Sequence, residues 1–132
     1  MTGTVTATVE KRASAKITKY IIDWLCSAAG AVSATFAELN LGEVSGRFRS
    51  CETIPGTNGD LTTNLPDSYS LTITDEYAYD LLEGFGAGRS ASAAERINPQ
   101  IEALLAMEDL TITIASAGNA KRGRIVFVIT KD

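Results

Sequence analysis

The sequence predicts an all-β fold, an antiparallel β-sandwich of jelly-roll-like form with about seven or eight short strands and one short helical segment. Segments in which apolar and polar residues alternate recur along the chain, as expected of strands that bury one face. Turn signals separate these segments at fairly regular intervals. Small and hydroxyl residues are abundant, with 18 Ala, 15 Thr, 11 Gly and 10 Ser, which favours short strands over a helical bundle. A closed barrel is the alternative arrangement.

Length and charge narrow the possible functions. The 132 residues suit one domain, residues 1–132, whose core needs no metal or disulfide. The net charge of −4 disfavours nucleic-acid binding, and the lack of histidine removes the commonest general base and metal ligand. We find no signal peptide and no apolar run of membrane-spanning length. We therefore expect no catalytic residue, cofactor, metal, nucleic-acid partner or membrane partner.

The two cysteines, Cys26 and Cys51, are too few for a thiolate zinc site and lack C-x-x-C spacing. We expect both to be buried and reduced, as small apolar residues are in a reducing compartment. A disulfide is the alternative, because the sequence leaves open whether the two residues lie close in space.

The first part of the chain predicts three strands. Residues 4–10 alternate cleanly and predict a half-buried strand, followed by a basic connection over residues 11–16. A strand is expected over residues 17–25, where β-branched and aromatic content favours it over a helix. Residues 27–30 form a turn that ends in glycine, and residues 31–38 alternate again. We therefore predict a β-hairpin from these last two strands.

A fourth strand is expected over residues 43–52. One face is predicted to carry Val44, Gly46 and Phe48. The other face is predicted to carry Glu43, Ser45, Arg47, Arg49 and Cys51. Arginine on a strand face is enriched at interfaces, although a solvated face explains Arg47 and Arg49 equally well. Residues 54–66 contain Pro-Gly, Asn-Gly and Asn-Leu-Pro, and predict a long loop.

The second half of the chain predicts further strands. The clearest covers residues 69–75, and residues 77–82 are expected to return as its partner. Residues 110–115 alternate in the same way. Residues 124–130 are almost continuously apolar, which predicts a central or fully covered strand, since an exposed one would aggregate.

One helical segment is expected over residues 90–105. This stretch is rich in Ala and Glu, and Ser92 with Glu95 three residues later resembles a capping box. Pro99 would interrupt a long helix, so the segment predicts one or two short helical turns around it.

Four acidic residues lie close together in the sequence: Asp75, Glu76, Asp80 and Glu83. They lack the alternate spacing of a helix–loop–helix calcium site, because tyrosine and alanine occupy the middle of the run. We interpret them as a solvated hairpin end. A hydrolase that uses Glu76 and Glu83 is the least favoured hypothesis.

The glycine-rich residues 84–90 predict a flexible, exposed loop. They lack both the G-K-[ST] ending of a phosphate-binding loop and the G-x-G-x-x-G spacing. Phe85 is the one large apolar side chain of the loop, and Arg89 lies near it. We expect Phe85 to be exposed and to anchor a partner. The alternative is that Phe85 folds back as a lid on its own sandwich.

Charge is distributed unevenly along the chain. Residues 67–95 carry six acids and one arginine, whereas residues 121–132 carry four bases and one acid. Opposite patches allow head-to-tail pairing or binding of a partner with matched charge, and ordinary surface scatter is the alternative.

Three stretches of strand and turn together resemble small virion structural proteins of tailed bacteriophages. The stretches are residues 21–24 with 30–33, residues 69–75 with 84–89, and residues 110–113 with 117–121. The resemblance covers most of residues 17–130, and residues 77–79 depart from it, since smaller turn residues are expected there. It implies a β-sandwich that binds the phage particle as a capsid decoration or cement protein.

This resemblance sets the functional expectations. The partners would be the phage major capsid protein and the chain itself, as a homodimer or homotrimer. The location would be the virion, and the host cytoplasm during assembly. The expected interface residues are Arg47, Phe48, Arg49, Phe85 and Arg89. A neck or tail component is the first alternative. The second is a carbohydrate-binding sandwich with Trp24, Tyr77 and Tyr79 as stacking rings, which burial of Trp24 would count against.

Overall fold

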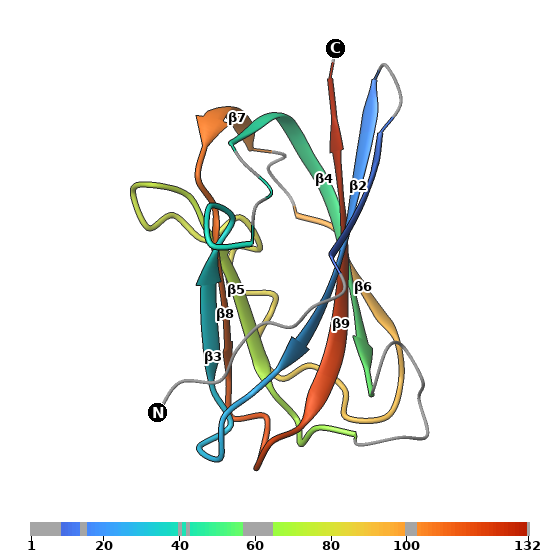
Figure 1. Cartoon of the computed structure of the whole chain (residues 1–132). Helices are drawn as coiled ribbons and strands as arrows, with labels where there is room; N and C mark the ends of the chain where they lie inside the picture. The colour runs from blue at the N-terminus through green and yellow to red at the C-terminus, as the bar shows by residue number, and fades with distance from the viewer. Residues whose placement is uncertain are drawn as a thin grey trace.

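In a computed structural model the chain forms two antiparallel β-sheets that face one another (Figure 1). The structure describes residues 9–13, 16–39, 41, 43–56, 65–99 and 103–131. The strands in these ranges are β1 (Val9–Ala13), β2 (Ile17–Leu25), β3 (Val32–Thr35), β4 (Val44–Pro55), β5 (Ser70–Thr74), β6 (Glu95–Ile97), β7 (Leu104–Glu108), β8 (Thr111–Ala115) and β9 (Arg122–Thr130). The predicted all-β class with antiparallel sheets is confirmed.

The larger sheet is organised around β9. Its strand order is β1-β2-β9-β4-β6, and β7 pairs with the other end of the same edge of β4. Strand β9 therefore lies between β2 and β4 along its length, as the apolar run in residues 124–130 predicted. Burial alternates along it, with Ile125, Phe127 and Ile129 buried and Val126 and Val128 half-buried.

The smaller sheet has the order β3-β8-β5. Beyond β5 the chain turns and runs back along the free edge of this strand without forming a regular strand. Leu81 N–H donates to Ile73 O at 2.8 Å, and Leu71 N–H donates to Gly86 O at 2.9 Å. The edge of β5 is thereby covered, which leaves fewer unpaired backbone groups for another chain to bind.

Aromatic rings from both layers fill the space between the sheets. Phe127 on β9 is fully buried and lies 5.0 Å from the ring centroid of Tyr20, 5.5 Å from that of Phe36 and 5.9 Å from that of Phe48. Large buried rings supply much of the hydrophobic stabilisation of a small domain. The apolar residues of the alternating segments are also buried, with Val32 and Ala34 in β3 and Leu71 and Ile73 in β5, so the alternating patterns located the core correctly.

One ion pair is buried on the opposite face of the larger sheet. Arg124 Nε donates to Asp23 Oδ1 at 2.7 Å and Nη2 donates to Asp23 Oδ2 at 3.1 Å. Asp23 is only 2 % exposed. The two residues are cross-strand partners in β2 and β9, so this bidentate contact ties the two strands in register.

The predicted β-hairpin of residues 17–25 and 31–38 is wrong. The turn itself is present, since Gly30 N–H donates to Ser27 O at 3.0 Å and Gly30 has a φ of +81°. However, β2 pairs with β9 and β3 pairs with β8, so the chain crosses from one sheet to the other. Ala117 N–H donates to Gly30 O at 2.9 Å, which holds this crossing against the connection between β8 and β9.

The predicted burial of Cys51 is confirmed, but the simple alternation predicted along residues 43–52 is wrong. The register between β4 and β9 shifts between Phe48 and Ser50, because Arg49 is an extra residue on β4. Such a β-bulge reverses which residues face inward beyond it. Phe48 before the bulge and Cys51 after it are therefore both fully buried.

Two predicted elements between residues 77 and 105 do not form. The described residues contain no helix, and residues 95–97 and 104–108 form β6 and β7 because they pair with β4. Residues 77–82 form turns with one isolated bridge between Thr74 and Asp80 instead of a strand. Asp75 accepts hydrogen bonds from the backbone N–H of Tyr77 and Tyr79, which fixes a tight turn in place of an extended segment.

The N-terminal prediction is tested only in part. Strand β1 covers residues 9–13, so the predicted basic connection is partly strand. The remainder of the predicted strand, residues 4–8, and residues 57–64 of the predicted long loop lie outside the described residues. Strand β4 extends to Pro55, which shortens that loop at its start.

Within the described ranges, no helix is long and apolar enough to cross a lipid bilayer.

Candidate functional site

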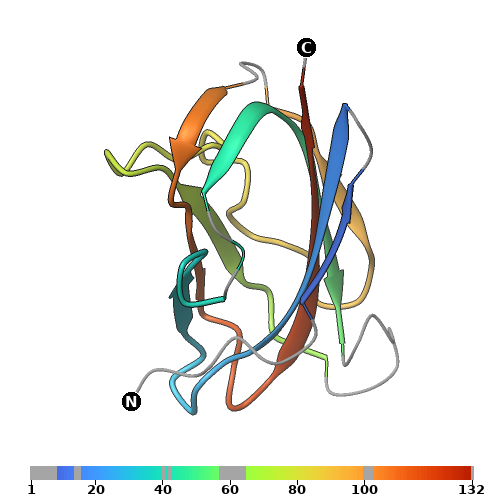
Figure 2. The same ribbon diagram turned by 45° about the horizontal axis from the view of Figure 1, so that its top comes forward.

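An open hollow lies between β6 and the segment that runs along β5. Its volume is about 250 Å³, and it is lined by Phe85, Arg89, Arg96, Ile97 and Asn98. We call it the Arg–Phe hollow. In Figures 1 and 2, β6 lies at one side of the larger sheet, next to β4, with which it pairs. The hollow therefore joins an edge of each sheet.

The segment that carries Phe85 and Arg89 is a largely exposed loop, as predicted, and hydrogen bonds connect it to β5. Besides the bond at Gly86, Arg89 N–H donates to Tyr69 O at 2.6 Å. A β-carbon on Gly86 would lie 2.9 Å from the carbonyl carbon of Leu71 and closer still to its oxygen. Glycine is therefore required at position 86 because the two backbones approach so closely.

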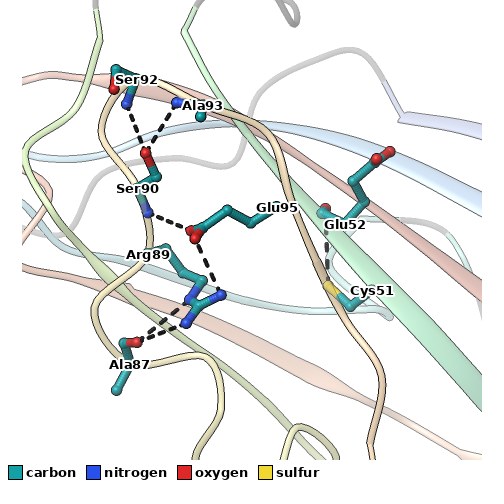
Figure 3. Close-up of polar contacts among 8 residues, drawn as sticks. All are labelled: Cys51, Glu52, Ala87, Arg89, Ser90, Ser92, Ala93 and Glu95. Carbon is teal, nitrogen blue, oxygen red and sulfur yellow. Dashed lines mark hydrogen bonds and ion pairs between the residues drawn. The ribbon is translucent and has the colours of Figure 1, made fainter.

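Hydrogen bonds and an ion pair orient the Arg89 side chain (Figure 3). Its Nη1 lies 3.6 Å from Glu95 Oε1, and its Nε and Nη2 donate to Ala87 O at 3.4 and 3.2 Å. Glu95 Oε1 also accepts a 2.6 Å hydrogen bond from Ser90 N–H. Glu95 therefore closes the loop before β6, and it does not cap a helix with Ser92 as the sequence predicted.

The remaining lining residues differ in exposure. Ile97 is buried at the base, Phe85 is 47 % exposed, and Arg96 and Asn98 are exposed. Among the residues that the structure describes, the guanidinium of Arg96 has no hydrogen-bond or ion-pair partner. The hollow thus offers an aromatic face beside two positive charges, of which one is uncompensated. Groups that suit this chemistry carry a carboxylate next to an apolar or aromatic surface.

The five predicted interface residues do not form one surface. Phe85 and Arg89 meet in the Arg–Phe hollow, whereas neither Arg47 nor Arg49 lines it. Arg47 is half-buried, and Arg49 is exposed at the bulge of β4 and donates from Nε to Thr130 Oγ1 at 3.0 Å. Phe48 is fully buried and belongs to the core, so it has no surface to offer a partner.

Two of the four neighbouring acidic residues, Asp75 and Asp80, stabilise local turns by accepting hydrogen bonds from the backbone. Asp75 holds the turn described above, and Asp80 accepts hydrogen bonds from the N–H groups of Leu82 and Gly84 at 3.0 and 2.9 Å. In the described part of the chain, no group of three or more Cys, Asp or Glu side chains could hold a metal ion. These acids were predicted to lie at the end of a β-hairpin. They lie instead in a turn that projects from the molecule and does not join two paired strands (Figure 1).

The three aromatic rings of the carbohydrate hypothesis, Trp24, Tyr77 and Tyr79, differ in their exposure to solvent. Trp24 is fully buried in the core and packs edge-on against Tyr69, with ring centroids 5.2 Å apart. It cannot stack on a sugar. Tyr77 and Tyr79 remain exposed, at 88 % and 43 %.

Sequence reasoning missed Arg96 and Asn98. Both follow Glu95 in a segment interpreted as helical, and only the pairing of β6 with β4 brings them beside Phe85. The one available signal was the Arg-Ile-Asn sequence directly before Pro99, which favours extended backbone.

In comparisons with known proteins, the chain matches no family model, no curated protein and no solved structure. The chemistry of the Arg–Phe hollow is therefore the starting point for its function.

Proposed function

We propose that this chain is a structural protein of a bacteriophage particle, a capsid decoration or cement protein that binds the assembled shell of the major capsid protein. It would act by binding alone, in the virion and in the host cytoplasm during assembly. The resemblance of its strand and turn segments to such proteins motivates the proposal, which includes their jelly-roll-like form of the sandwich. Two antiparallel sheets with an aromatic core supply the rigid scaffold that this role needs.

The observation that carries the proposal is the placement of Phe85. This ring is 47 % exposed, although the backbone on both sides of it is hydrogen-bonded to β5. A large apolar ring held on a rigid segment loses little conformational entropy when a partner covers it. Rings beside arginine are typical anchors of protein interfaces. Phe85 in the Arg–Phe hollow is therefore suited to contact a neighbouring subunit of a particle.

Binding of this kind stabilises a shell by mass action. A protein that binds the assembled shell more tightly than free subunits shifts the equilibrium toward assembly. Several copies that bind together through repeated contacts gain further from their high effective concentration on the lattice. Small individual contacts such as the Arg–Phe hollow are sufficient under these conditions.

The test is cosedimentation of the purified chain with empty shells of the major capsid protein from the same genome. We expect the wild type to bind, and Phe85→Ala to weaken binding at least about tenfold. Met107→Ala is the matched control, because Met107 is also exposed, at 63 %, but lies on β7 away from the hollow.

Two results would count against the proposal. A wild-type chain that fails to cosediment with the shells would overturn the decoration role. A fall in melting temperature for Phe85→Ala, with shell binding intact, would identify Phe85 as a lid on its own sandwich. The control should change neither shell binding nor melting temperature.

A further inference from the structure

The Arg–Phe hollow is small enough to select its occupant. At about 250 Å³ it lies below the usual size of pockets for small ligands, roughly 300–1,000 Å³. It is also open to one side, so it suits a side chain or two that project from another surface. Its exposed, uncompensated Arg96 and its Phe85 ring suit a carboxylate beside an aromatic or apolar group.

The chain itself presents such a group in the turn over residues 75–80. The sequence there is Asp-Glu-Tyr-Ala-Tyr-Asp, and Tyr77 at its centre is the most exposed large apolar side chain in the described ranges, at 88 %. No Lys or Arg forms an ion pair with Asp75, Glu76 or Asp80 among the described residues. This tip therefore carries an aromatic ring that can pack on Phe85 and the negative charge that the hollow lacks.

The tip is ordered in a conformation ready for binding. Asp75 Oδ1 accepts hydrogen bonds from Tyr77 N–H at 2.8 Å and Tyr79 N–H at 3.0 Å, and Glu76 Oε1 accepts one from Asp109 N–H at 3.1 Å. The Tyr77 ring itself is 88 % exposed. A preorganised loop binds with a smaller entropic cost than a disordered one.

The tip cannot fill the hollow of its own molecule. Tyr69 pairs with Arg89 at one end of β5, and Thr74 pairs with Asp80 at the other. The five residue steps from Tyr69 to Thr74 separate the two sites by about 16 Å of extended strand. Figure 1 shows the turn after β5 projecting from the smaller sheet, while β6 borders the larger one, and Figure 2 agrees.

From this complementarity we infer that the Arg–Phe hollow binds residues 75–80 of a second copy of the chain. Tyr77 would pack on Phe85, and a carboxylate of the tip would pair with Arg96. Such a contact is head-to-tail, because it joins two different surfaces, and it produces a closed ring or an open filament. The inference rests on the proposed function and deepens it: the neighbouring subunit at the hollow is a second copy of the chain, and Phe85→Ala weakens shell binding because copies that are no longer joined lose their combined contacts with the shell. It is tested on the isolated chain without a shell.

The experiment measures self-association by sedimentation velocity over a range of concentrations. A hollow variant, Phe85→Ala with Arg96→Gln, and a tip variant, Glu76→Gln with Tyr77→Ala, each remove one ring and one charge. A matched control, Met107→Ala with Lys131→Gln, removes an exposed apolar side chain and one charge elsewhere. Glutamine at position 76 keeps the acceptor for Asp109 N–H. The melting temperature of each variant confirms that it folds.

The wild type and the control should associate equally, and each of the two variants should associate at least about tenfold more weakly. The decisive sample is an equimolar mixture of the two variants. Each supplies the surface that the other lacks, so the mixture should form heterodimers and nothing larger. If one double variant fails to fold, its single substitutions Arg96→Gln and Tyr77→Ala replace it in the mixture.

The inference is overturned if the wild type stays monomeric, if either variant associates as strongly as the wild type, or if the mixture fails to form heterodimers. Loss of association in the control as well would show that net charge, and not this contact, governs association. Shell binding by a monomeric wild type would leave the proposed function standing while this inference fails.

Discussion

The indole ring of Trp24 occupies the place where a β-carbon on Gly123 would lie. Such a carbon would be 2.5 Å from Cε2 of Trp24 and 2.8 Å from Nε1. The two residues are cross-strand partners in β2 and β9, and the ring is fully buried between the sheets. Glycine is thus required at position 123 by the close approach of a side chain, and its backbone conformation does not demand it.

Gly123→Ala should therefore lower the free energy of unfolding by about 1–3 kcal/mol, because the ring must move within a filled core. Urea denaturation measures this change. The same substitution in a Trp24→Phe background should cost less, since a smaller ring leaves room for the methyl group. An equal cost in both backgrounds would contradict this explanation of Gly123.

Substitutions on β9 should depend on which face they alter. Phe127→Asp places a carboxylate among buried rings and should prevent folding, at a cost above about 3 kcal/mol. Val126→Asp lies on the half-buried face and should cost about 1–2 kcal/mol. Circular dichroism and urea denaturation separate the two outcomes. Fast amide hydrogen exchange along β9 in the folded wild type would refute its central position.

Both cysteines should be free and slow to react in the folded protein. Cys26 Sγ donates to Gly118 O and accepts from Lys121 N–H, each at 3.1 Å, and burial raises the pKa of the Cys51 thiol. The thiolate is the reactive species, so a raised pKa slows alkylation. Mass spectrometry should find two reduced thiols that label only after unfolding. Rapid labelling of the native state, or a disulfide in protein kept without oxidant, would contradict this.

The free energy of unfolding should fall at alkaline pH, partly because Tyr69 is buried. Burial raises the pKa of Tyr69 from 10.0 to about 12 and outweighs the neighbouring Thr53 hydroxyl, which acts in the opposite direction. Between pH 10 and 12 the unfolded chain therefore ionises while the folded one stays neutral, and stability is lost as pH rises. By pH 11.5 the loss amounts to roughly 2 kcal/mol.

Tyr69→Phe isolates this contribution. Urea denaturation of both proteins from pH 9 to 11.5 should give a shallower decline for the variant. Cys51, whose burial raises its pKa from 9.0, contributes a loss in the same direction to both proteins and cancels in the comparison. Identical pH profiles would show that Tyr69 titrates normally in the folded state.

The alternating strands could be predicted because each carries its own pattern. Tyr69, Leu71 and Ile73 are buried on one face as their spacing predicted, and the apolar run of residues 124–130 located the central strand. Which strands pair could not be predicted in the same way. The turn at Gly30 is the same local structure whether the chain reverses within one sheet or crosses to the other.

Other differences arise where tertiary contacts override local preference. Residues 104–108, Leu-Leu-Ala-Met-Glu, favour a helix by composition but form β7 because β4 offers them a pairing edge. The extra residue at Arg49 reverses the faces of β4 without any change in its alternating pattern. Glycines at positions 84, 86 and 88 suggested mobility, yet Gly86 allows the close backbone contact that fixes the segment.

Two of the five lining residues of the candidate site were visible in the sequence. Phe85 and Arg89 stood out because they are near neighbours in a glycine-rich segment. Arg96 and Asn98 reach the same hollow only through the three-residue pairing of β6 with β4, which no periodicity reveals. Phe48 was wrongly predicted to be an interface residue. A phenylalanine between two arginines on a strand gives the same sequence pattern whether its ring faces solvent or the core.

The most direct test of the virion proposal is a reconstruction of the intact particle at side-chain resolution. We expect many copies of the chain on the outer surface of the capsid shell, with Phe85 and Arg96 of each copy covered by residues 75–80 of a neighbouring copy. A particle without the chain, or with the chain only in the neck or tail, would contradict the decoration role.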